Sequence, residues 1–284
     1  MSGPYQRRAG SIIAAILLFA VGPTNSEPAY SPPSPHIKNG FLTFGFLPVE
    51  SPVALFKRFA PLRDYLSMQI QIKIRMETAK NFTEFVKRTR QRRYDLVFTA
   101  PHMALYALEQ QNYEAAATFA KPLKSVIVVR KNSAIQNIAA LEGKTIATPP
   151  ESAIVTLVGK RYLQENALTA IRYRVTRTHN AAYSSVLGQE TDAAIISNFI
   201  AKKAIANNLP LKIVGQSDPF PGIGILVAKD LPDSIKQHIK TSLWGMKDLP
   251  HGKKILREIA QPGYVKATRL QFEKLRPYVN SAIP

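Results

Sequence analysis

The feature that most constrains this chain is a repeated succession of short apolar strands and capped amphipathic helices that begins at Gly40. Ser51-Pro52, for example, supplies an N-cap followed by proline at the first helical position, and apolar residues then recur at helical spacing through Leu66. The first run comprises strands at 41–47, 69–76 and 96–98 and helices at 51–66, 81–90 and from 101 onward. Because helical crossovers join parallel strands, this order predicts a mainly parallel sheet with helices on its faces.

A second run of the same style follows. It comprises strands at 125–130, 146–147, 171–176, 193–196, 211–214 and 224–228, helices at 153–165 and 178–187, and a largely helical segment at 234–278. No Gly/Ser-rich linker separates the two runs. We therefore expect an α/β protein of two lobes, with the chain crossing between them through strands.

The first 26 residues predict a secretory signal peptide. Arg7 and Arg8 form a basic region, Ser11–Val21 is an apolar stretch too short to span a bilayer, and Thr24-Asn25-Ser26 offers small residues for a cleavage site. An N-terminal membrane anchor is the alternative. Residues 27–36 are rich in proline and serine, which predicts a flexible linker before the fold.

The chain is strongly basic and contains no cysteine. Lys and Arg number 38 against 19 Asp and Glu, and removal of the first 26 residues would leave a formal charge of +17. The densest cluster, residues 87–93, lies at the end of a predicted helix and lacks the interleaved aromatics of a single-strand nucleic-acid binder. A solvated helix end is therefore favoured over a nucleic-acid or membrane-surface patch, and the lack of cysteine excludes disulfides and thiolate catalysis.

Four predicted helix starts indicate function. They lie at Ser51-Pro52, at Thr99-Ala-Pro-His102, at Ser152 and at Thr178-His179, each a few residues after a strand. The first N–H groups of a helix have no intrahelical partner and the positive end of the helix dipole lies behind them, so such starts can bind anions. Since ligands of open α/β sheets bind beyond the carboxyl ends of the strands, the four starts together predict an oxyanion site in a cleft. For any single start, an ordinary capped helix is the alternative.

A series of short motifs runs through the chain in a fixed order. It comprises Gly45-Phe-Leu-Pro48, Pro61-Leu-Arg-Asp-Tyr-Leu66, Tyr94-Asp-Leu-Val-Phe-Thr-Ala-Pro101, Leu141-Glu-Gly-Lys-Thr145, Thr178-His-Asn-Ala-Ala182 and Leu243-Trp-Gly-Met246. In this order the motifs resemble the phosphate/phosphite/phosphonate-binding proteins of ABC importers, the PhnD-type periplasmic family, from residue 45 to about 278. The resemblance implies a type II periplasmic-binding-protein fold, with a hinge and a ligand cleft between a lobe formed by 37–121 plus 219–284 and a lobe formed by 122–218.

The resemblance also implies ligand residues. Ser152 matches the first hydroxyl of the family's Ser-Thr-Ser-Gly loop, and His179 matches its oxyanion-contacting histidine. The chain then departs from the family, because Ala153, Ile154 and Val155 stand where the loop offers Thr, Ser and Gly. Asn198 stands near the place where aminophosphonate binders keep a carboxylate, so an aminophosphonate is not the expected ligand. His102 could replace the missing donors, or it could be a surface histidine in the first turn of a helix.

Together these features predict a periplasmic solute-binding protein, not an enzyme, that captures a small oxyanion or phosphonate-like ligand for an ABC permease. The candidate ligand-binding residues are Ser51, Thr99, His102, Ser152, His179 and Asn198. We expect a monomer with no cofactor, no metal site and no nucleic-acid partner. Ligand sensing for a membrane signalling partner is the alternative. An enzyme is less favoured, since no Ser-His-Asp order, metal-spaced histidine cluster or Gly-rich phosphate loop occurs.

Overall fold

The computed structural model describes residues 1, 3 and 40–280. The predicted signal peptide and linker therefore lie almost wholly outside the described residues and stay predictions. Among the residues that the structure describes, no helix combines the length and apolar content needed to cross a membrane.

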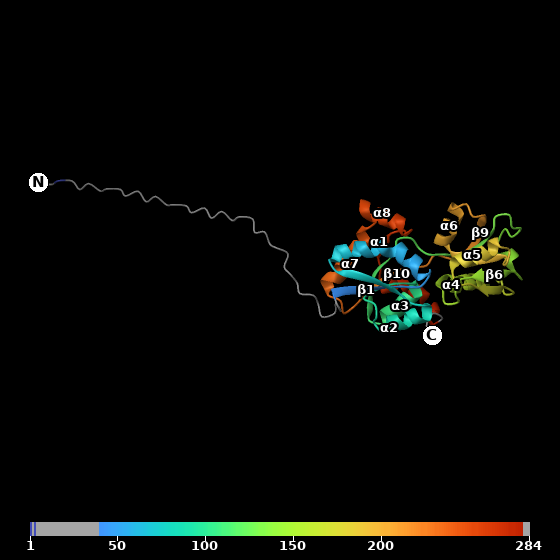
Figure 1. Cartoon of the computed structure of the whole chain (residues 1–284), viewed down its shortest axis with the longest axis horizontal. Helices are drawn as coiled ribbons and strands as arrows, with labels where there is room; N and C mark the ends of the chain where they lie inside the picture. Colours follow the sequence, from blue (N-terminus) through green and yellow to red (C-terminus); the bar gives the residue numbers. More distant parts are fainter. Residues whose placement is uncertain (2, 4–39, 281–284) are drawn as a thin grey trace. The chain divides into compact units, whose positions relative to one another are not determined.

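The first lobe is built on a six-stranded mixed sheet of order β11-β4-β10-β3-β1-β2. Its strands are β1 (Phe41–Phe46), β2 (Lys73–Thr78), β3 (Leu96–Thr99), β4 (Tyr113–Phe119), β10 (Gly224–Ala228) and β11 (Tyr264–Lys266). Strand β1 runs parallel to β2 and β3, whereas β10 pairs antiparallel with β3 and β4. The sheet thus joins early and late parts of the chain, which Figure 1 shows as blue to green elements beside orange to red ones.

Helices from both ends of the chain cover this sheet. They are α1 (Pro52–Ile70), α2 (Phe82–Arg90), α3 (Pro101–Gln110), α7 (Asp233–Gly245), α8 (Pro250–Glu258), α9 (Arg269–Phe272) and the 3-10 helix η3 (Glu273–Tyr278). A buried aromatic cluster joins the sheet to α1: the ring centroid of Phe59 lies 5.0 Å from that of Phe46 and 4.9 Å from that of Phe98. This packing fixes the start of α1 beside the carboxyl ends of β1 and β3.

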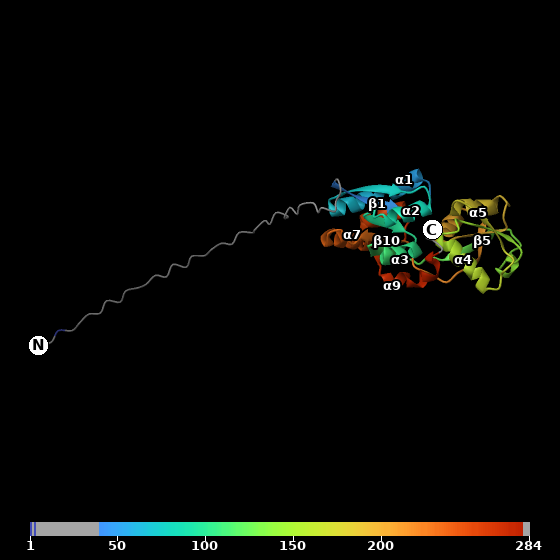
Figure 2. The same ribbon diagram turned by 90° about the horizontal axis from the view of Figure 1, so that it is seen from below.

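The second lobe has a five-stranded sheet of order β7-β6-β8-β5-β9. Its elements are β5 (Ser125–Arg130), η2 (Ala139–Leu141), β6 (Thr145–Thr148), α4 (Ile154–Glu165), β7 (Arg172–Val175), α5 (His179–Leu187), β8 (Ala193–Ser197), α6 (Asn198–Ala206) and β9 (Leu211–Gln216). Strand β6 is parallel to β7 and β8, and β5 is antiparallel to β8 and β9. In Figures 1 and 2 the elements from α4 to β9 form a group of their own in both views.

Two crossover segments join the lobes, one between β4 and β5 and one between β9 and β10. They pair with each other, since the main-chain N–H of Leu123 donates to the carbonyl of Phe220 and the N–H of Phe220 donates back to Leu123, both at 2.9 Å. The chain therefore crosses through extended segments, as the sequence predicts. The exact lobe boundaries at 121/122 and 218/219 stay predictions.

Several elements differ from the sequence-based expectation. The first sheet is mixed and not mainly parallel as predicted, because β10, which follows the second crossover, and β11 enter it antiparallel to their neighbours. The second sheet is also mixed, because β5, which follows the first crossover, is antiparallel to β8 and β9. The predicted strand at 69–76 begins only at Lys73, since α1 continues to Ile70. Strands β4 and β11 and helix α6 are not among the predicted elements.

Candidate ligand-binding cleft

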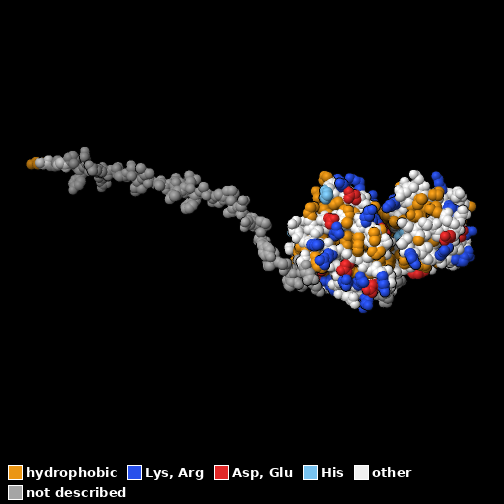
Figure 3. Space-filling view, in the orientation of Figure 1, with side chains coloured by type: hydrophobic (Ala, Val, Ile, Leu, Met, Phe, Trp, Pro, Cys, Tyr) orange, Lys and Arg blue, Asp and Glu red, His pale blue; other side chains and the backbone are white. Residues whose placement is uncertain are grey.

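A cavity of about 660 Å³ lies between the two lobes, and both contribute its walls. In the space-filling view it corresponds to the hollow between the two bodies of the molecule (Figure 3). The residues around it come from the starts of α1, α4, α5 and α6, and the cap residue of α3, Ala100, also reaches it. Each of these helices follows a strand directly, so the carboxyl ends of strands from both sheets face one space.

The start of α5 provides the most polar part of this cavity. The Thr178 hydroxyl caps the helix by accepting the main-chain N–H of Ala181 at 3.1 Å. The main-chain N–H groups of His179 and Asn180, the first two residues of the helix, have no intrahelical acceptor. Thr178, His179 and Asn180 all line the cavity, so this helix start faces the space where a ligand would lie.

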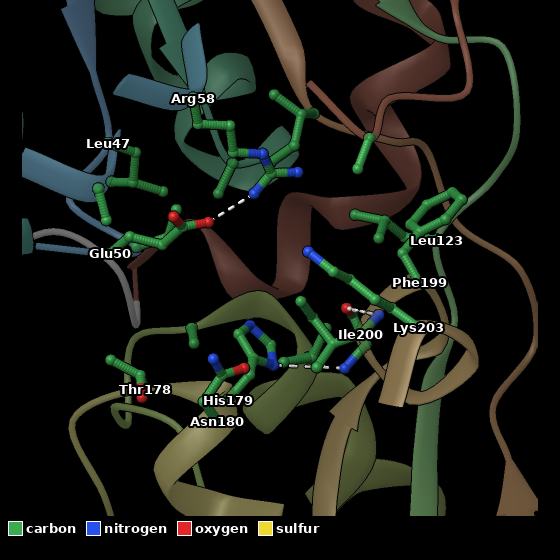
Figure 4. Close-up of a pocket in the computed structure, with 18 of the residues that line it drawn as sticks. Leu47, Glu50, Arg58, Leu123, Thr178, His179, Asn180, Phe199, Ile200 and Lys203 are labelled. Carbon is green, nitrogen blue, oxygen red and sulfur yellow. Dashed lines mark hydrogen bonds and ion pairs between the residues drawn. The ribbon is translucent and has the colours of Figure 1, made fainter. Parts of the chain in front are cut away.

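His179 presents a hydrogen-bond donor to the cavity. Its Nδ1 lies 3.4 Å from the main-chain nitrogen of Ser197 and accepts that N–H, which leaves the proton of the neutral ring on Nε2. Figure 4 shows that the other ring nitrogen of His179 makes no marked hydrogen bond and faces the open space. Burial lowers the pKa of His179 to about 4, so the half-buried ring is neutral at pH 7. A neutral Nε2–H can donate to an oxyanion without adding charge.

Three charged side chains line the cavity, and they come from both lobes. Arg58 of α1 pairs with Glu50 at 2.5 Å and also donates through Nε to the carbonyl of Ile259 at 2.8 Å. Lys203 of α6 has no ion pair or hydrogen-bond partner for its ammonium group among the described residues. In Figure 4 its Nζ extends across the open space toward the Glu50–Arg58 pair. Arg58 is therefore neutralised by Glu50, whereas the ammonium group of Lys203 is available to a ligand.

The wall at the start of α4 is apolar. Ala153, Ile154 and Val155 are 7%, 5% and 3% exposed and pack in a cluster that includes Leu123 and Leu275. The helix has no side-chain cap, because its N-cap is Ala153. The next hydroxyl, that of Thr156, donates to the carbonyl of Pro149 at 3.2 Å and is buried. This helix start can therefore offer main-chain N–H groups but no hydroxyl to a ligand.

His102 and Ser152 meet each other but do not line the cavity. The Nε2 of His102, on α3, lies 3.1 Å from the carbonyl oxygen of Ser152, which precedes α4 in the other lobe. Burial lowers the pKa of the fully buried His102 to about 4. The ring is therefore neutral and donates across the lobe boundary. His102 is thus not the surface histidine that the sequence leaves open, and its Nδ1 has no partner among the described residues.

Of the three remaining candidates, one lines the cavity and two lie outside its lining. Ser51 lines the cavity, but its hydroxyl caps α1 by accepting the N–H of Ala54 at 3.3 Å. Thr99 is 1% exposed and lies beneath the α3 start, away from the cavity. Asn198 holds the first crossover: its Oδ1 accepts the N–H of Lys124 at 3.1 Å, and its Nδ2 donates to the carbonyl of Pro122 at 3.3 Å. Of the six candidates, only Ser51 and His179 therefore line the cavity.

Within residues 40–280 no group of three or more His, Asp or Glu side chains is arranged to hold a metal ion. The cavity lining includes the uncompensated cation Lys203 and the donor of His179, which suit an anion, together with side chains that can both donate and accept, such as Asn180 and Gln261.

Comparison with known proteins assigns the chain to a family. Residues 44–272 match the model of the ABC-transporter phosphonate periplasmic substrate-binding proteins. The chain belongs to this family. A phosphonates-binding periplasmic protein of Escherichia coli K12 is 24% identical over 260 residues, which cover 83% of this chain and 75% of the relative.

Solved structures show the same fold. PhnD1 of Prochlorococcus marinus MIT 9301, determined with methylphosphonate, superposes with a TM-score of 0.75 at 19% identity, covering 85% of this chain and 98% of PhnD1. A binding-protein component of an ABC phosphonate transporter from Pseudomonas aeruginosa gives a TM-score of 0.72 at 17% identity, covering 85% and 86%. The type II periplasmic-binding-protein fold expected from the sequence is confirmed, and the family is one of periplasmic substrate-binding proteins.

Sequence reasoning missed two cationic side chains, Arg58 and Lys203, and the helix start that carries one of them. Ser197 caps α6 by accepting the N–H of Ile200 at 3.3 Å, directly after strand β8. The sequence contains a signal for this helix start: a strand, then a serine, then apolar residues at helical spacing. The same signal identifies the start of α1 at Ser51. Lys203 lies on the second turn of that helix and could have been considered with it.

Proposed function

We propose that this family member is a non-catalytic periplasmic solute receptor that captures a small anion in the cavity between its lobes and delivers it to an ABC permease. The observation that carries the proposal is the convergence, in one cavity, of the unpaired Lys203 ammonium and the Nε2–H of His179. The start of α5 adds main-chain N–H groups and the positive end of a helix dipole. Membership of the phosphonate-binding family and the phosphonate named for the relatives support the same class of ligand.

Closure of the lobes around the ligand follows from this arrangement. The available donors lie on the second lobe, whereas the Glu50–Arg58 pair and Ser51 face them from the first. A ligand that touches both sides favours the conformation in which the lobes approach each other. We propose that the paired crossovers at Leu123 and Phe220 serve as the hinge.

A thermal-shift screen of the purified protein tests the anion-binding proposal. The panel contains phosphate, phosphite, sulfate, methylphosphonate, phenylphosphonate and an aminophosphonate. A ligand at one hundred times its Kd stabilises the native state by about 2.7 kcal/mol, which raises the Tm of a domain of this size by roughly 5–10 °C. No shift with any anion of the panel would refute the proposal.

Paired substitutions locate the site. Lys203→Ala and His179→Ala should each weaken binding of a ligand from the screen by about tenfold or more, because each removes a hydrogen bond or charge contact to an anion. Lys202→Ala is the matched control, since Lys202 is an exposed neighbour on the same helix and does not line the cavity. Equal effects of Lys202→Ala and Lys203→Ala would show only a general loss of positive charge.

A further inference from the structure

We propose that the ligand is an amphipathic monoanion, with one singly charged headgroup and an alkyl or aryl body larger than a methyl group. This inference rests on the proposed anion-binding function and specifies the ligand of the same cavity. It follows from three properties of the cavity: its charge, the side on which its donors lie, and the nature of the remaining wall.

The charge of the cavity matches a single negative charge. Of the three charged side chains that line it, Glu50 and Arg58 neutralise each other at 2.5 Å. Only Lys203 is left without a counter-charge among the described residues, and His179 is neutral. A second negative charge on the headgroup would have no cationic partner in a partly desolvated space, which is unfavourable.

The donors best placed for a charged headgroup lie on the second-lobe side of the cavity, although Arg58 and Gln261 also line it from the first lobe. His179 and the first N–H groups of α5 lie beside each other, and Lys203 reaches the same space from α6 (Figure 4). Ser197, whose hydroxyl caps α6, also lines this side. A headgroup bound there makes its polar contacts with the second lobe, and the rest of the ligand extends away from that group of donors.

The adjoining wall offers the rest of the ligand almost no polar partner. Ile154 and Val155 at the start of α4 line the cavity together with Leu123 of the crossover and Phe199 of α6. Phe82 and Phe119 continue this wall in the first lobe. The rings of Phe119 and Phe199 pack edge to face, with 5.9 Å between their centroids. An oxyanion placed against these side chains would exchange water for methyl groups and rings, whereas an apolar body would gain from leaving water.

The size of the cavity agrees with such a body. Its volume of about 660 Å³ lies within the range of small-molecule sites. A phosphonate whose only carbon is a methyl group would fill a small part of it. Closure of the lobes would reduce the space, but it would bring apolar walls together around the ligand.

The test measures calorimetric binding of two ligand series to the wild-type protein at pH 7. One series is methyl-, hexyl- and phenylphosphonate, and the other is methane-, hexane- and benzenesulfonate, whose headgroup carries one charge at all relevant pH values. We expect the hexyl and phenyl members to bind at least tenfold tighter than the methyl member in each series. We also expect phenylphosphonate to lose affinity relative to benzenesulfonate as the pH rises and the phosphonate takes up its second charge.

The outcomes separate this inference from the proposed function. Methylphosphonate binding as tightly as phenylphosphonate would overturn the inference and leave anion capture intact. Binding of phosphonates with no measurable binding of sulfonates would overturn the monoanion part. A failure of every ligand in both series would overturn the inference together with the proposed function.

A substitution in the apolar wall gives a second, independent measurement. Val155→Ser should weaken phenylphosphonate binding about fivefold and leave methylphosphonate binding within twofold, because the apolar contact it removes from the cavity lies beside the body of the ligand; it also removes packing in the cluster with Leu123 and Leu275, which lowers the Tm of the unliganded variant. Val175→Ser is the matched control, since Val175 is 49% exposed on β7 and does not line the cavity. Equal loss for both ligands would contradict the inference, and the Tm of each unliganded variant checks its folding.

Discussion

At the scale of single residues, two histidines at helix starts have the same charge but different tasks. His179 directs its donor into the cavity, whereas His102 uses its donor to join α3 of one lobe to the loop before α4 of the other. Burial lowers the pKa of both rings to about 4. Both rings are therefore neutral. As neutral donors, His179 can bind a ligand and His102 can hold the contact between the lobes.

The buried neutral state of His102 makes the stability of the protein depend on pH. The pKa is about 6.5 in the unfolded chain and about 4 in the folded protein, so the unfolded state binds more protons in this interval and stability falls as the pH decreases from 6.5 toward 4. Between pH 7 and pH 5 we expect a loss of about 2 kcal/mol from this residue. Urea unfolding of the wild type and of His102→Gln at both pH values measures it, since the variant should lose less stability on acidification.

The control for this comparison is an exposed histidine. His238→Gln, on the surface of α7, should reproduce the pH dependence of the wild type. If the free energy of unfolding falls equally for the wild type and for His102→Gln between pH 7 and pH 5, His102 is protonated in the folded protein at pH 5 and the prediction is wrong.

At the scale of elements, helix starts with similar caps serve different purposes. Thr178 caps α5, which opens into the cavity, and Asn81 caps α2 by accepting the N–H of Glu84 at 2.8 Å. The α5 start brings hydrogen-bond donors to the cavity, whereas the α2 start brings only the apolar side chain of Phe82 and Asn81 itself does not line the cavity. The cap of α5 therefore stabilises the helix and also fixes the position of the donors.

Replacing each cap separates these two effects. Thr178→Ala and Asn81→Ala should each lower the free energy of unfolding by about 1 kcal/mol, because each leaves one N–H of the first turn without its side-chain acceptor. Only Thr178→Ala should also weaken ligand binding. Denaturant unfolding and calorimetry on both variants measure the two quantities, and equal affinities would show that the α5 start does not contact the ligand.

Helix caps are local sequence signals, and this explains which elements of the fold could be predicted. The starts of α1 and α5 follow from a hydroxyl cap and the residues directly after it, and both are observed where the sequence places them. Strand β4 was missed because its centre is alanine-rich (Tyr113–Phe119) and owes its conformation to pairing with β10 and β11, which follow it by more than one hundred residues. No short-range pattern contains that information.

The site was less predictable than the fold, because it depends on which helix starts face each other. Asn198 is a polar residue after a strand, as a ligand residue would be, yet its amide holds the crossover at Pro122 and Lys124. Arg58 and Lys203 are ordinary cations of amphipathic helices in the sequence. Their distinction arises from the folded structure: the loop before α1 brings Glu50 to Arg58 within the first lobe, whereas no described acidic residue lies within ion-pair distance of Lys203 on α6.

At the scale of the whole molecule, the positive charge is distributed and not concentrated at the cavity. Figure 3 shows Lys and Arg side chains over much of the visible face of both bodies. In the basic segment 87–93 three cations are paired: Arg88 with Glu84, Arg92 with Asp230 and Arg93 with Glu77. This pairing agrees with a solvated helix end, whereas Lys203 at the cavity has no ion pair among the described residues.

Solution scattering tests the motion of the lobes. If the ligand contacts both lobes, saturating phenylphosphonate should decrease the radius of gyration of the wild-type protein, because the lobes approach each other. Lys203→Ala should need about ten times more ligand than the wild type to reach the same decrease. An unchanged radius for a wild-type protein that calorimetry shows to be saturated would mean that binding occurs without closure.

The position of Leu123 has a mechanical consequence. Its side chain is part of the cavity wall, while its main chain forms the paired bridge with Phe220 between the lobes. If the paired crossovers serve as the hinge, a ligand body that touches Leu123 acts directly on the hinge. A displacement of a fraction of an ångström at the hinge becomes several times larger at the outer surfaces of the two lobes. We therefore expect that the bulk of the ligand body, and not only its headgroup, affects how far the two lobes close.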